Sequence, residues 1–270
     1  MSLLVRLNYL WRLFATGIAF TLFGIGGVLL PLLATPLLYL LPGGKPRRQV
    51  AARWLIHRLF LAFIHIMRLL GILSWRLEGK EKLDRKGLLI LANHPTLIDI
   101  VFIIAFVPSA SCIVKSKLLR NPAMRGFILH AGYITNDRGS ALIEDARHAL
   151  AQDANLVIFP EGTRSRPGEN LQFQRGAANI AIRCQTDITP IVIDCNPPSL
   201  GKNQPWYDIP DRPIVLSFSI QDDIPITPFL AGSATLGARR LTERLEQFFT
   251  REPSLHGQHR APPGAQNTDH

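Results

Sequence analysis

A histidine and an aspartate five positions apart, His94 and Asp99, are the first residues in this chain that suggest chemistry. They stand in "LANHPTLIDIVF", where a strand-like apolar run ends at Asn93 and a helix-like apolar run follows. Their side chains can meet only if His94 lies in the loop before the helix, because five positions on one helix are about 140° apart around its axis. A carboxylate bonded to one imidazole nitrogen leaves the other free as a base. The pair is therefore a candidate for deprotonating a hydroxyl group without a protein nucleophile.

The same aspartate allows a purely structural interpretation. Thr96 and Asp99 have the spacing of a helical capping box, in which the acidic side chain accepts a backbone N–H of the first turn. A carboxylate has two oxygens, so Asp99 can cap the helix and orient His94 at the same time. Both interpretations stay open at this point.

A second polar cluster, "FPEGTRS" at residues 159–165, directly follows the buried strand pattern "NLVI". Gly162 permits close approach of the backbone, and Arg164 can grip a phosphate with two N–H groups. We therefore expect this loop to bind a phosphate ester, with Thr163 and Ser165 adding hydroxyls to Gly162 and Arg164, and we count Glu161 among its substrate-binding candidates. The alternative is a polar turn in which Arg164 pairs with Glu161 at the surface.

Arg138 is a further candidate phosphate ligand. It ends the segment "GYITNDR", which follows the pattern of a short strand and its exit loop. The competing interpretation is a simple turn built around Asp137 and Arg138, since aspartate favours turns by bonding its own backbone.

Short apolar runs and helical patterns alternate from about residue 86 onward. The strand patterns are "GLLILAN", "ASCIVK", "AGYIT", "NLVIFP", "ITPIVID" and "PIVLSFS". Helical patterns separate several of them, at roughly 97–107, 140–151, 175–184 and 233–250. This alternation predicts an α/β fold with a mixed or mainly parallel sheet flanked by helices. In such sheets ligands bind where strands end, which is where His94 stands.

The N-terminal third predicts a membrane anchor. Residues 13–44 contain no charged residue, and this run exceeds the roughly 20 residues that cross a bilayer. Pro31 and Pro36 argue against one straight helix, so a kinked span and a hairpin bending near these prolines both stay open. The run is too long for the apolar part of a cleaved signal peptide. The larger basic cluster follows the run, which predicts a cytoplasmic catalytic domain at the cell (inner) membrane.

Residues 51–75 have a different pattern, with basic residues and histidines gathered within an arc of about 140° on an otherwise apolar helix. This predicts an interfacial helix in the lipid headgroup region, and the alternative is a surface helix packed on a globular core. We therefore divide the chain into an anchoring region (1–78), a catalytic domain (79–251) and a C-terminal tail (252–270) predicted to be disordered.

The charge distribution favours a lipid surface over nucleic acid. Residues 1–92 carry 13 Lys and Arg against 3 Asp and Glu, whereas the rest of the chain is balanced. These basic residues flank apolar segments, as in proteins that bind anionic membranes. The three cysteines, Cys112, Cys184 and Cys195, have no metal-ligand spacing and indicate a reducing compartment. We therefore expect no metal site and no nucleic-acid partner.

Residues 87–220 resemble the glycerolipid acyltransferase family typified by 1-acylglycerol-3-phosphate acyltransferase. Four ordered motifs carry the resemblance. They are the Asn-His-x-Thr-x-x-Asp run from Asn93 to Asp99, the strand from Gly132 to Arg138, the Phe-Pro-Glu-Gly-Thr-Arg-Ser run from Phe159 to Ser165, and the Pro190 segment "ITPIVI". Thr135 and Asn136 stand where the family often has apolar residues, a departure that concerns acceptor preference. A separate departure is Gln174, which stands where lysine is common.

The resemblance implies a fold like that of glycerol-3-phosphate acyltransferase, with N-terminal membrane helices. It implies transfer of a fatty acyl group from acyl-CoA or acyl carrier protein to the hydroxyl of a lysophospholipid, with no other cofactor. His94 would be the general base and Asp99 its orienting partner, while Arg138 and the 161–164 loop would hold the acceptor. Backbone N–H groups at the helix start would stabilise the oxyanion.

Two other functions stay open from the sequence. One is the same chemistry on another lipid acceptor, such as another lysophospholipid, an aminoacyl lipid or a polyene lipid. The other is a membrane-anchoring protein that binds anionic lipid without catalysis, which explains the basic N-terminal third but not the two motifs. A phosphatase is disfavoured, because no metal-ligand set or covalent phosphate acceptor stands out.

Overall fold

Seven strands form one sheet in the order β1-β7-β6-β2-β5-β3-β4 in the computed structural model. The structure describes residues 3–165 and 171–258, and it describes side chains only up to Arg251. Neighbouring strands are parallel except β6 and β7. The strands are β1 (Leu73–Glu78), β2 (Leu89–Ala92), β3 (Ala110–Val114), β4 (Ile134–Thr135), β5 (Asn155–Ile158), β6 (Ile188–Asn196) and β7 (Ile214–Ile220). The predicted mixed α/β sheet is confirmed, and all six predicted strands are present.

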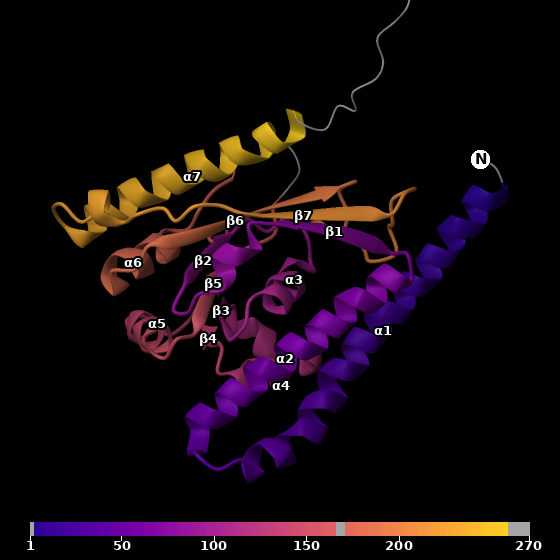
Figure 1. Cartoon of the computed structure of the whole chain (residues 1–270), viewed down its shortest axis with the longest axis horizontal. Coiled ribbons are helices and arrows are strands. Elements are labelled where there is room, and N and C mark those ends of the chain that lie inside the picture. The colour runs from indigo at the N-terminus through magenta and orange to yellow at the C-terminus, as the bar shows by residue number, and fades with distance from the viewer. Residues whose placement is uncertain (1–2, 166–170, 259–270) are drawn as a thin grey trace, which may run out of the picture.

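Helices cover both faces of this sheet (Figure 1). One face carries α2 (Gly44–Leu69), α3 (Asp99–Phe106) and α4 (Pro122–Ala131), and the other carries α5 (Ala141–Ala151), α6 (Arg175–Cys184) and α7 (Ala234–Gln258). Strand side chains alternate between the two cores: Ile90 and Ala92 join the first, and Leu89 and Leu91 join the second. All four are fully buried, so β2 is a central strand that holds the loop at its carboxyl end rigidly.

Two elements were not predicted. Strand β1 has the alternating sequence "LSWRLE", but it follows directly on the apolar helix pattern that ends at Leu69. Because β1 pairs with β7, the sheet begins six residues before the predicted domain boundary at residue 79. Helix α4 starts with Asn121 as its cap and Pro122 in its first turn, and Gly132 ends it in the left-handed conformation. Short 3₁₀ helices at Lys80–Leu83, Ser116–Arg120 and Thr227–Phe229 complete the connections.

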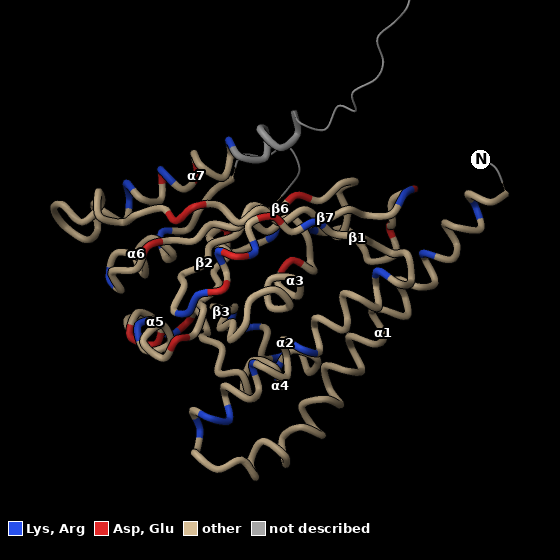
Figure 2. The backbone as a smooth tube through the Cα atoms, viewed as in Figure 1, with Lys and Arg blue, Asp and Glu red and all other residues tan. Residues whose placement is uncertain are grey.

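The N-terminal helices form an antiparallel hairpin (Figure 1). Helix α1 (Leu3–Leu40) is continuous through Pro31 and Pro36, and its axis turns over the last turns, where these prolines lie. The chain reverses later than predicted, at residues 41–43, where Gly43 has a φ of 104°. Both helices are long and apolar enough to cross a membrane, by length and composition. Figure 2 shows the long uncharged stretch of α1, with basic residues near both of its ends.

Helix α2 is packed on the domain more closely than an interfacial helix would be. Its side chains Ile56, Phe60 and Ile64 are buried in the core beneath α3 and α4. Two residues of the predicted polar face also point inward: Arg53 Nε donates to Ala131 O at 2.8 Å, and His57 Nδ1 lies 2.9 Å from Ile104 O. The helix ends at Leu69 rather than near residue 75, because the chain turns there to enter β1. The alternative of a helix packed on the core therefore describes α2 better.

Helix α1 packs on α4 with almost no space between the backbones. A Cβ atom added at Gly27 would lie 2.3 Å from the carbonyl oxygen of Ala123. One added at Gly126 would lie 2.3 Å from Cβ of Pro31. Both glycines are therefore needed for this contact, which closes the space between the hairpin and the sheet.

The C-terminal tail is partly helical. Helix α7 continues to Gln258, so it includes residues 252–258 of the predicted tail. The remaining tail residues, 259–270, lie outside the described residues.

The carboxylate of Asp223 ties three segments together far from the catalytic candidates. Arg85 donates to both of its oxygens, at 2.7 and 2.9 Å, and Thr189 Oγ1 donates at 2.7 Å. These hydrogen bonds, from Arg85 first and Thr189 second, lower the pKa of Asp223 below its ordinary value of 3.8. The stability they contribute is present above pH 3.8 and is lost as the pH falls through the lowered folded-state pKa.

We expect Asp223→Asn to lower the free energy of unfolding at pH 7 by about 1 kcal/mol, because the pair is partly exposed. The difference from the unsubstituted protein should shrink below pH 3.8. Thermal unfolding in detergent at the two pH values measures this. Asp222→Asn is the matched control. The Asp222 side chain pairs with Lys82 but is 94% exposed, so little change in the free energy of unfolding is expected. Equal destabilisation of the Asp223 variant at both pH values would contradict the lowered pKa of Asp223.

Candidate active site

Asn93 fixes the point at which strand β2 ends and the catalytic loop begins. Its Nδ2 donates to Ile193 O at 2.8 Å, and Ile193 N donates back to its Oδ1 at 2.7 Å. The buried amide thus continues the pairing of β2 with β6 by one more step. This clamp holds the backbone at His94 rigidly against the central sheet.

The predicted contact between His94 and Asp99 is present. His94 lies in the loop before α3, and its Nδ1 is 2.8 Å from Asp99 Oδ2. The same oxygen accepts the backbone N–H of Thr96 at 2.7 Å, and the second oxygen accepts the Thr96 hydroxyl. Asp99 is fully buried, whereas the His94 side chain is 18% exposed. Asp99 therefore orients His94 and caps the start of α3 at once.

The geometry selects one tautomer of the imidazole. In the neutral imidazole the proton lies on Nδ1, because Nδ1 faces a carboxylate, and Nε2 is then the acceptor. The ring stacks on Phe159, with centroids 4.2 Å apart and planes 24° from parallel. Ring plane and tautomer are thus both fixed, as a general base requires.

Glu161 ties the two motif loops together. Its Oε1 accepts the backbone N–H of His94 at 2.9 Å and the Ser165 hydroxyl at 2.8 Å. Ser165 N in turn donates to His94 O at 2.8 Å. Burial raises the pKa of Glu161, and these hydrogen bonds partly offset the rise. The carboxylate, predicted to contact substrate, is engaged in positioning His94.

Arg164 braces the loop that follows strand β6. Its Nη1 donates to Leu200 O at 3.0 Å and to Gly201 O at 2.7 Å, and Leu97 N donates to Leu200 O at 3.0 Å. Beside it, Gly162 adopts a φ of 64°, and Thr163 is exposed. The loop around Leu200 was not predicted to belong to the site, because no motif marks it in the sequence.

Arg138 stands apart from these residues. Its Nε pairs with Asp145 Oδ2 at 2.7 Å, on the helix that follows. None of its described contacts joins it to the His94 loop. This pair uses Nε of a half-exposed guanidinium and neither supports nor contradicts the predicted phosphate contact, which stays a prediction.

A mostly apolar cavity of about 500 Å³ has His94 in its wall. Residues of α1, α2, α3 and α4 form most of the lining, together with Ser199 and Leu200. The lining continues along α3 from Leu97, just before the helix, to Ile104, so the cavity runs along this helix away from His94. The space under the helical hairpin is thus shaped for an extended hydrocarbon group.

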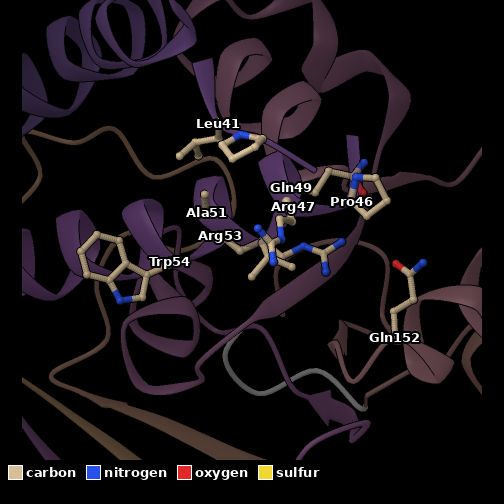
Figure 3. A pocket seen from close by; sticks show the side chains of 10 residues that line it. Leu41, Pro46, Arg47, Gln49, Ala51, Arg53, Trp54 and Gln152 are labelled. Carbon is tan, nitrogen blue, oxygen red and sulfur yellow. The ribbon is translucent and has the colours of Figure 1, made fainter. Parts of the chain in front are cut away.

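A second hollow, of about 900 Å³, lies beside the turn of the hairpin (Figure 3). Leu41, Trp54 and Gln152 are among the residues that line it. Although it is larger, it contains none of the predicted catalytic or substrate-binding residues. The chemistry therefore belongs to the cavity at His94.

Residues 74–194 match the model of the acyltransferase family. The fold is similar to that of the crystal structure of the 1-acyl-sn-glycerophosphate acyltransferase from Thermotoga maritima, with a TM-score of 0.68. The similarity covers 89% of this chain and 96% of that chain at 20% sequence identity. The match to the acyltransferase family thus covers residues 74–194, and the likeness to the solved structure is one of fold.

The chain is also similar in sequence to curated 1-acyl-sn-glycerol-3-phosphate acyltransferases. It is 37% identical over 124 residues to a 1-acyl-sn-glycerol-3-phosphate acyltransferase of Helicobacter pylori, covering 43% of this chain and 52% of that protein. It is 29% identical over 202 residues to the enzyme of that name from Saccharomyces cerevisiae, covering 72% and 63%. The chain thus spans about half the length of the curated relatives that it matches.

Proposed function

We propose that this protein transfers a fatty acyl group from a thioester to the free hydroxyl of 1-acylglycerol-3-phosphate, giving phosphatidate. The observation that carries the proposal is the His94–Asp99 pair at the wall of an apolar cavity. The names of the relatives support the acceptor. The basic and apolar N-terminal third supports action at a lipid surface, where both acceptor and product reside.

In this mechanism His94 Nε2 accepts the proton of the acceptor hydroxyl as its oxygen attacks the thioester carbonyl carbon. The carbonyl electron pair moves to oxygen and forms a tetrahedral intermediate. Its collapse breaks the carbon–sulfur bond, and the leaving thiolate takes the proton from His94. Asp99 stabilises the transient imidazolium through the hydrogen bond to Nδ1. The thioester supplies the activation, so the proposal needs no metal or organic cofactor.

The acceptor phosphate would bind at the 162–164 loop, beside His94. The proposal uses those N–H groups of Arg164 that make no contact with the described residues and the exposed hydroxyl of Thr163, while Gly162 permits close approach. The two carbonyl contacts of Arg164 Nη1 hold its guanidinium in place before the ligand arrives. Glu161 serves the acceptor indirectly, by holding this loop to His94.

The experiment that tests the function is thiol release from acyl-CoA and from acyl carrier protein, with a panel of lysolipids and mass detection of products. We expect release to depend on added 1-acylglycerol-3-phosphate and to yield phosphatidate. Equal transfer to neutral lysolipids would favour another acceptor. Absence of release with both donors would leave a membrane-anchoring protein that binds anionic lipid.

The cavity along α3 is proposed to hold the acyl chain of the donor. Ile104 lines it roughly 7.5 Å along the helix from Asp99, at about 1.5 Å for each residue. Ile104→Phe should shorten the space by about two methylene groups and lower kcat/KM for long-chain donors about tenfold. Short-chain donors on the same variant serve as the internal control and should be transferred normally. An equal loss for all chain lengths would place the acyl chain elsewhere.

The catalytic domain is proposed to lie on the cytoplasmic face of the cell membrane. The basic cluster from Lys45 to Arg48 follows the apolar run and favours this orientation. Protease added to sealed, right-side-out vesicles should then spare the sheet domain. Cleavage of α7 in such vesicles would contradict the orientation.

A further inference from the structure

The hollow at the turn of the helical hairpin has an apolar wall that no part of the described chain covers (Figure 3). All of its lining residues except Gln152 belong to the turn or to the N-terminal part of α2. Leu41, Val50 and Trp54 line it, and each keeps an exposed side chain. Apolar side chains gathered in one exposed hollow usually mark a site where a hydrophobic partner binds.

The charged residues of this lining are both arginines. Arg53 is engaged, since its Nε donates to Ala131 O at 2.8 Å, whereas Arg47 makes no hydrogen bond or ion pair with a described residue. The side chain of Arg47 lies against the turn, because a Cβ atom added at Gly43 would be 2.3 Å from its Cδ. Its guanidinium is therefore available to an anion at the edge of the apolar wall.

The surroundings of the hollow add to this positive charge. Lys45 and Arg48 stand beside Arg47 at the start of α2, and no Asp or Glu precedes Glu78 in the chain. Figure 2 shows basic residues at the end of the hairpin where α2 begins. A partner with negative charge is thus favoured on electrostatic grounds, and each basic residue near an anionic surface contributes to its attraction.

Aromatic side chains flank the basic ones, a combination typical of the boundary between membrane and water. The guanidinium carbon of Arg48 lies 4.4 Å from the ring centroid of Tyr39, and the Tyr39 and Trp54 side chains are 64% and 62% exposed. The hollow is also continuous with the uncharged surface of α1, where Leu40, the neighbour of Leu41 in the chain, is 80% exposed. A phospholipid offers hydrocarbon to the wall and a phosphate to the arginine, whereas an acidic protein or a nucleic acid would leave the wall uncovered.

We propose that this hollow binds an anionic phospholipid of the bilayer, with its phosphate on Arg47 and its hydrocarbon against Trp54. The site is separate from the acyl-transfer reaction, because the hollow and the cavity at His94 have no lining residue in common. A lipid bound there holds the turn of the hairpin at the level of the headgroups. It also makes attachment of the protein selective for negatively charged lipids.

Trp54 serves as the reporter of binding. The full-length protein in zwitterionic detergent micelles is titrated with phosphatidylglycerol whose acyl chains carry bromine, which quenches tryptophan fluorescence on contact. The quenching that belongs to Trp54 is the difference between the unsubstituted protein and Trp54→Phe. We expect half of this quenching at a lipid concentration about fivefold lower than with brominated phosphatidylcholine, which is the factor for one arginine near anionic headgroups. Absence of Trp54 quenching, or equal quenching by both lipids, would overturn the proposal.

Arg47→Gln should raise the half-quenching concentration of phosphatidylglycerol about fivefold and remove the preference over phosphatidylcholine. Arg58→Gln is the matched control, because Arg58 is an exposed arginine of the same helix that does not line the hollow. Its half-quenching concentration should be unchanged. Equal weakening by both substitutions would indicate diffuse attraction to the lipid surface and would refute a site at Arg47.

Turnover and mass distinguish this site from two other assignments. Thiol release by Arg47→Gln in detergent, with saturating substrates, should equal that of the unsubstituted protein, since Arg47 does not line the cavity at His94. A fall in kcat would make the hollow part of the reaction. Self-association that Trp54→Asp abolishes, without quenching by lipid, would assign the hollow to a second copy of the chain. If selective quenching is found but neither protein releases thiol, the acyl-transfer proposal fails and the lipid site stands.

Discussion

Replacing His94 by alanine is expected to lower kcat by about 10²–10⁴-fold, the usual contribution of a general base. The methyl group of alanine can neither accept the proton of the acceptor hydroxyl nor return it to the leaving thiolate. The contact of Nδ1 with Asp99 at 2.8 Å and the stacking on Phe159 are the observations that support His94 as the proposed base. Thiol release at saturating donor and acceptor measures the effect directly.

The control for this substitution is another histidine. His148 lies on the exposed side of α5, where it contacts Gln152, and it is absent from the cavity wall. His148→Ala should leave kcat unchanged. Both variants should still sediment with lipid vesicles, because α1 and α2 are untouched. Normal turnover by the His94 variant would refute the general-base mechanism.

Local sequence patterns were sufficient to predict most of the sheet and the contact between His94 and Asp99. The six predicted strands are short apolar runs bounded by polar turns, and the central strands β2 and β5 are buried on both faces. The His94–Asp99 contact was also predictable, because both residues belong to one strand–loop–helix unit. Strand β1 was missed because its first residues extend an apolar helix pattern, so the change of period is visible only over six residues. Helix α4 did carry readable signals in Asn121, Pro122 and Gly132.

Contacts between distant segments could not be predicted from the sequence. Asn93 and Ile193 meet because β2 and β6 are neighbours in the sheet, although they are 100 positions apart in the chain. The same pairing brings the loop of Ser199 to His94. Polar residues of α2 were placed facing the headgroups, yet Arg53 and His57 bond to backbone carbonyls of α4 and α3. A helical wheel shows that such residues share one face of the helix, but it does not show whether that face contacts lipid or the protein core.

Arg138 has a carboxylate neighbour that the sequence motif does not reveal. The motif placed it in a phosphate site, but Asp145 lies on the next helix, α5, and takes its guanidinium at 2.7 Å. Arg164 has a comparable motif position and instead donates to the carbonyls of Leu200 and Gly201. A carboxylate neutralises an arginine, whereas carbonyls only orient it, and among the described residues Arg164 contacts only carbonyls.

Asp99→Asn should separate the two roles of this side chain. Asparagine can keep its oxygen toward His94 Nδ1 and Thr96 N, and its NH₂ can donate to the Thr96 hydroxyl. The cap and the tautomer are then retained, and the negative charge that stabilises the imidazolium is lost. We expect kcat to fall on the order of 10³-fold with little loss of stability. Thiol release and thermal unfolding of the same preparation measure the two effects.

Thr96→Val is the matched partner of this substitution. It removes the hydroxyl donor to Asp99 but keeps the backbone N–H contact and the His94 contact. Because a buried acceptor loses one hydrogen bond, the free energy of unfolding should fall by about 1 kcal/mol, with a change in kcat of only a few-fold. The opposite pattern, an Asp99 variant that turns over normally but melts early, would make Asp99 a helix cap alone. His94 would then have no charged partner in the reaction.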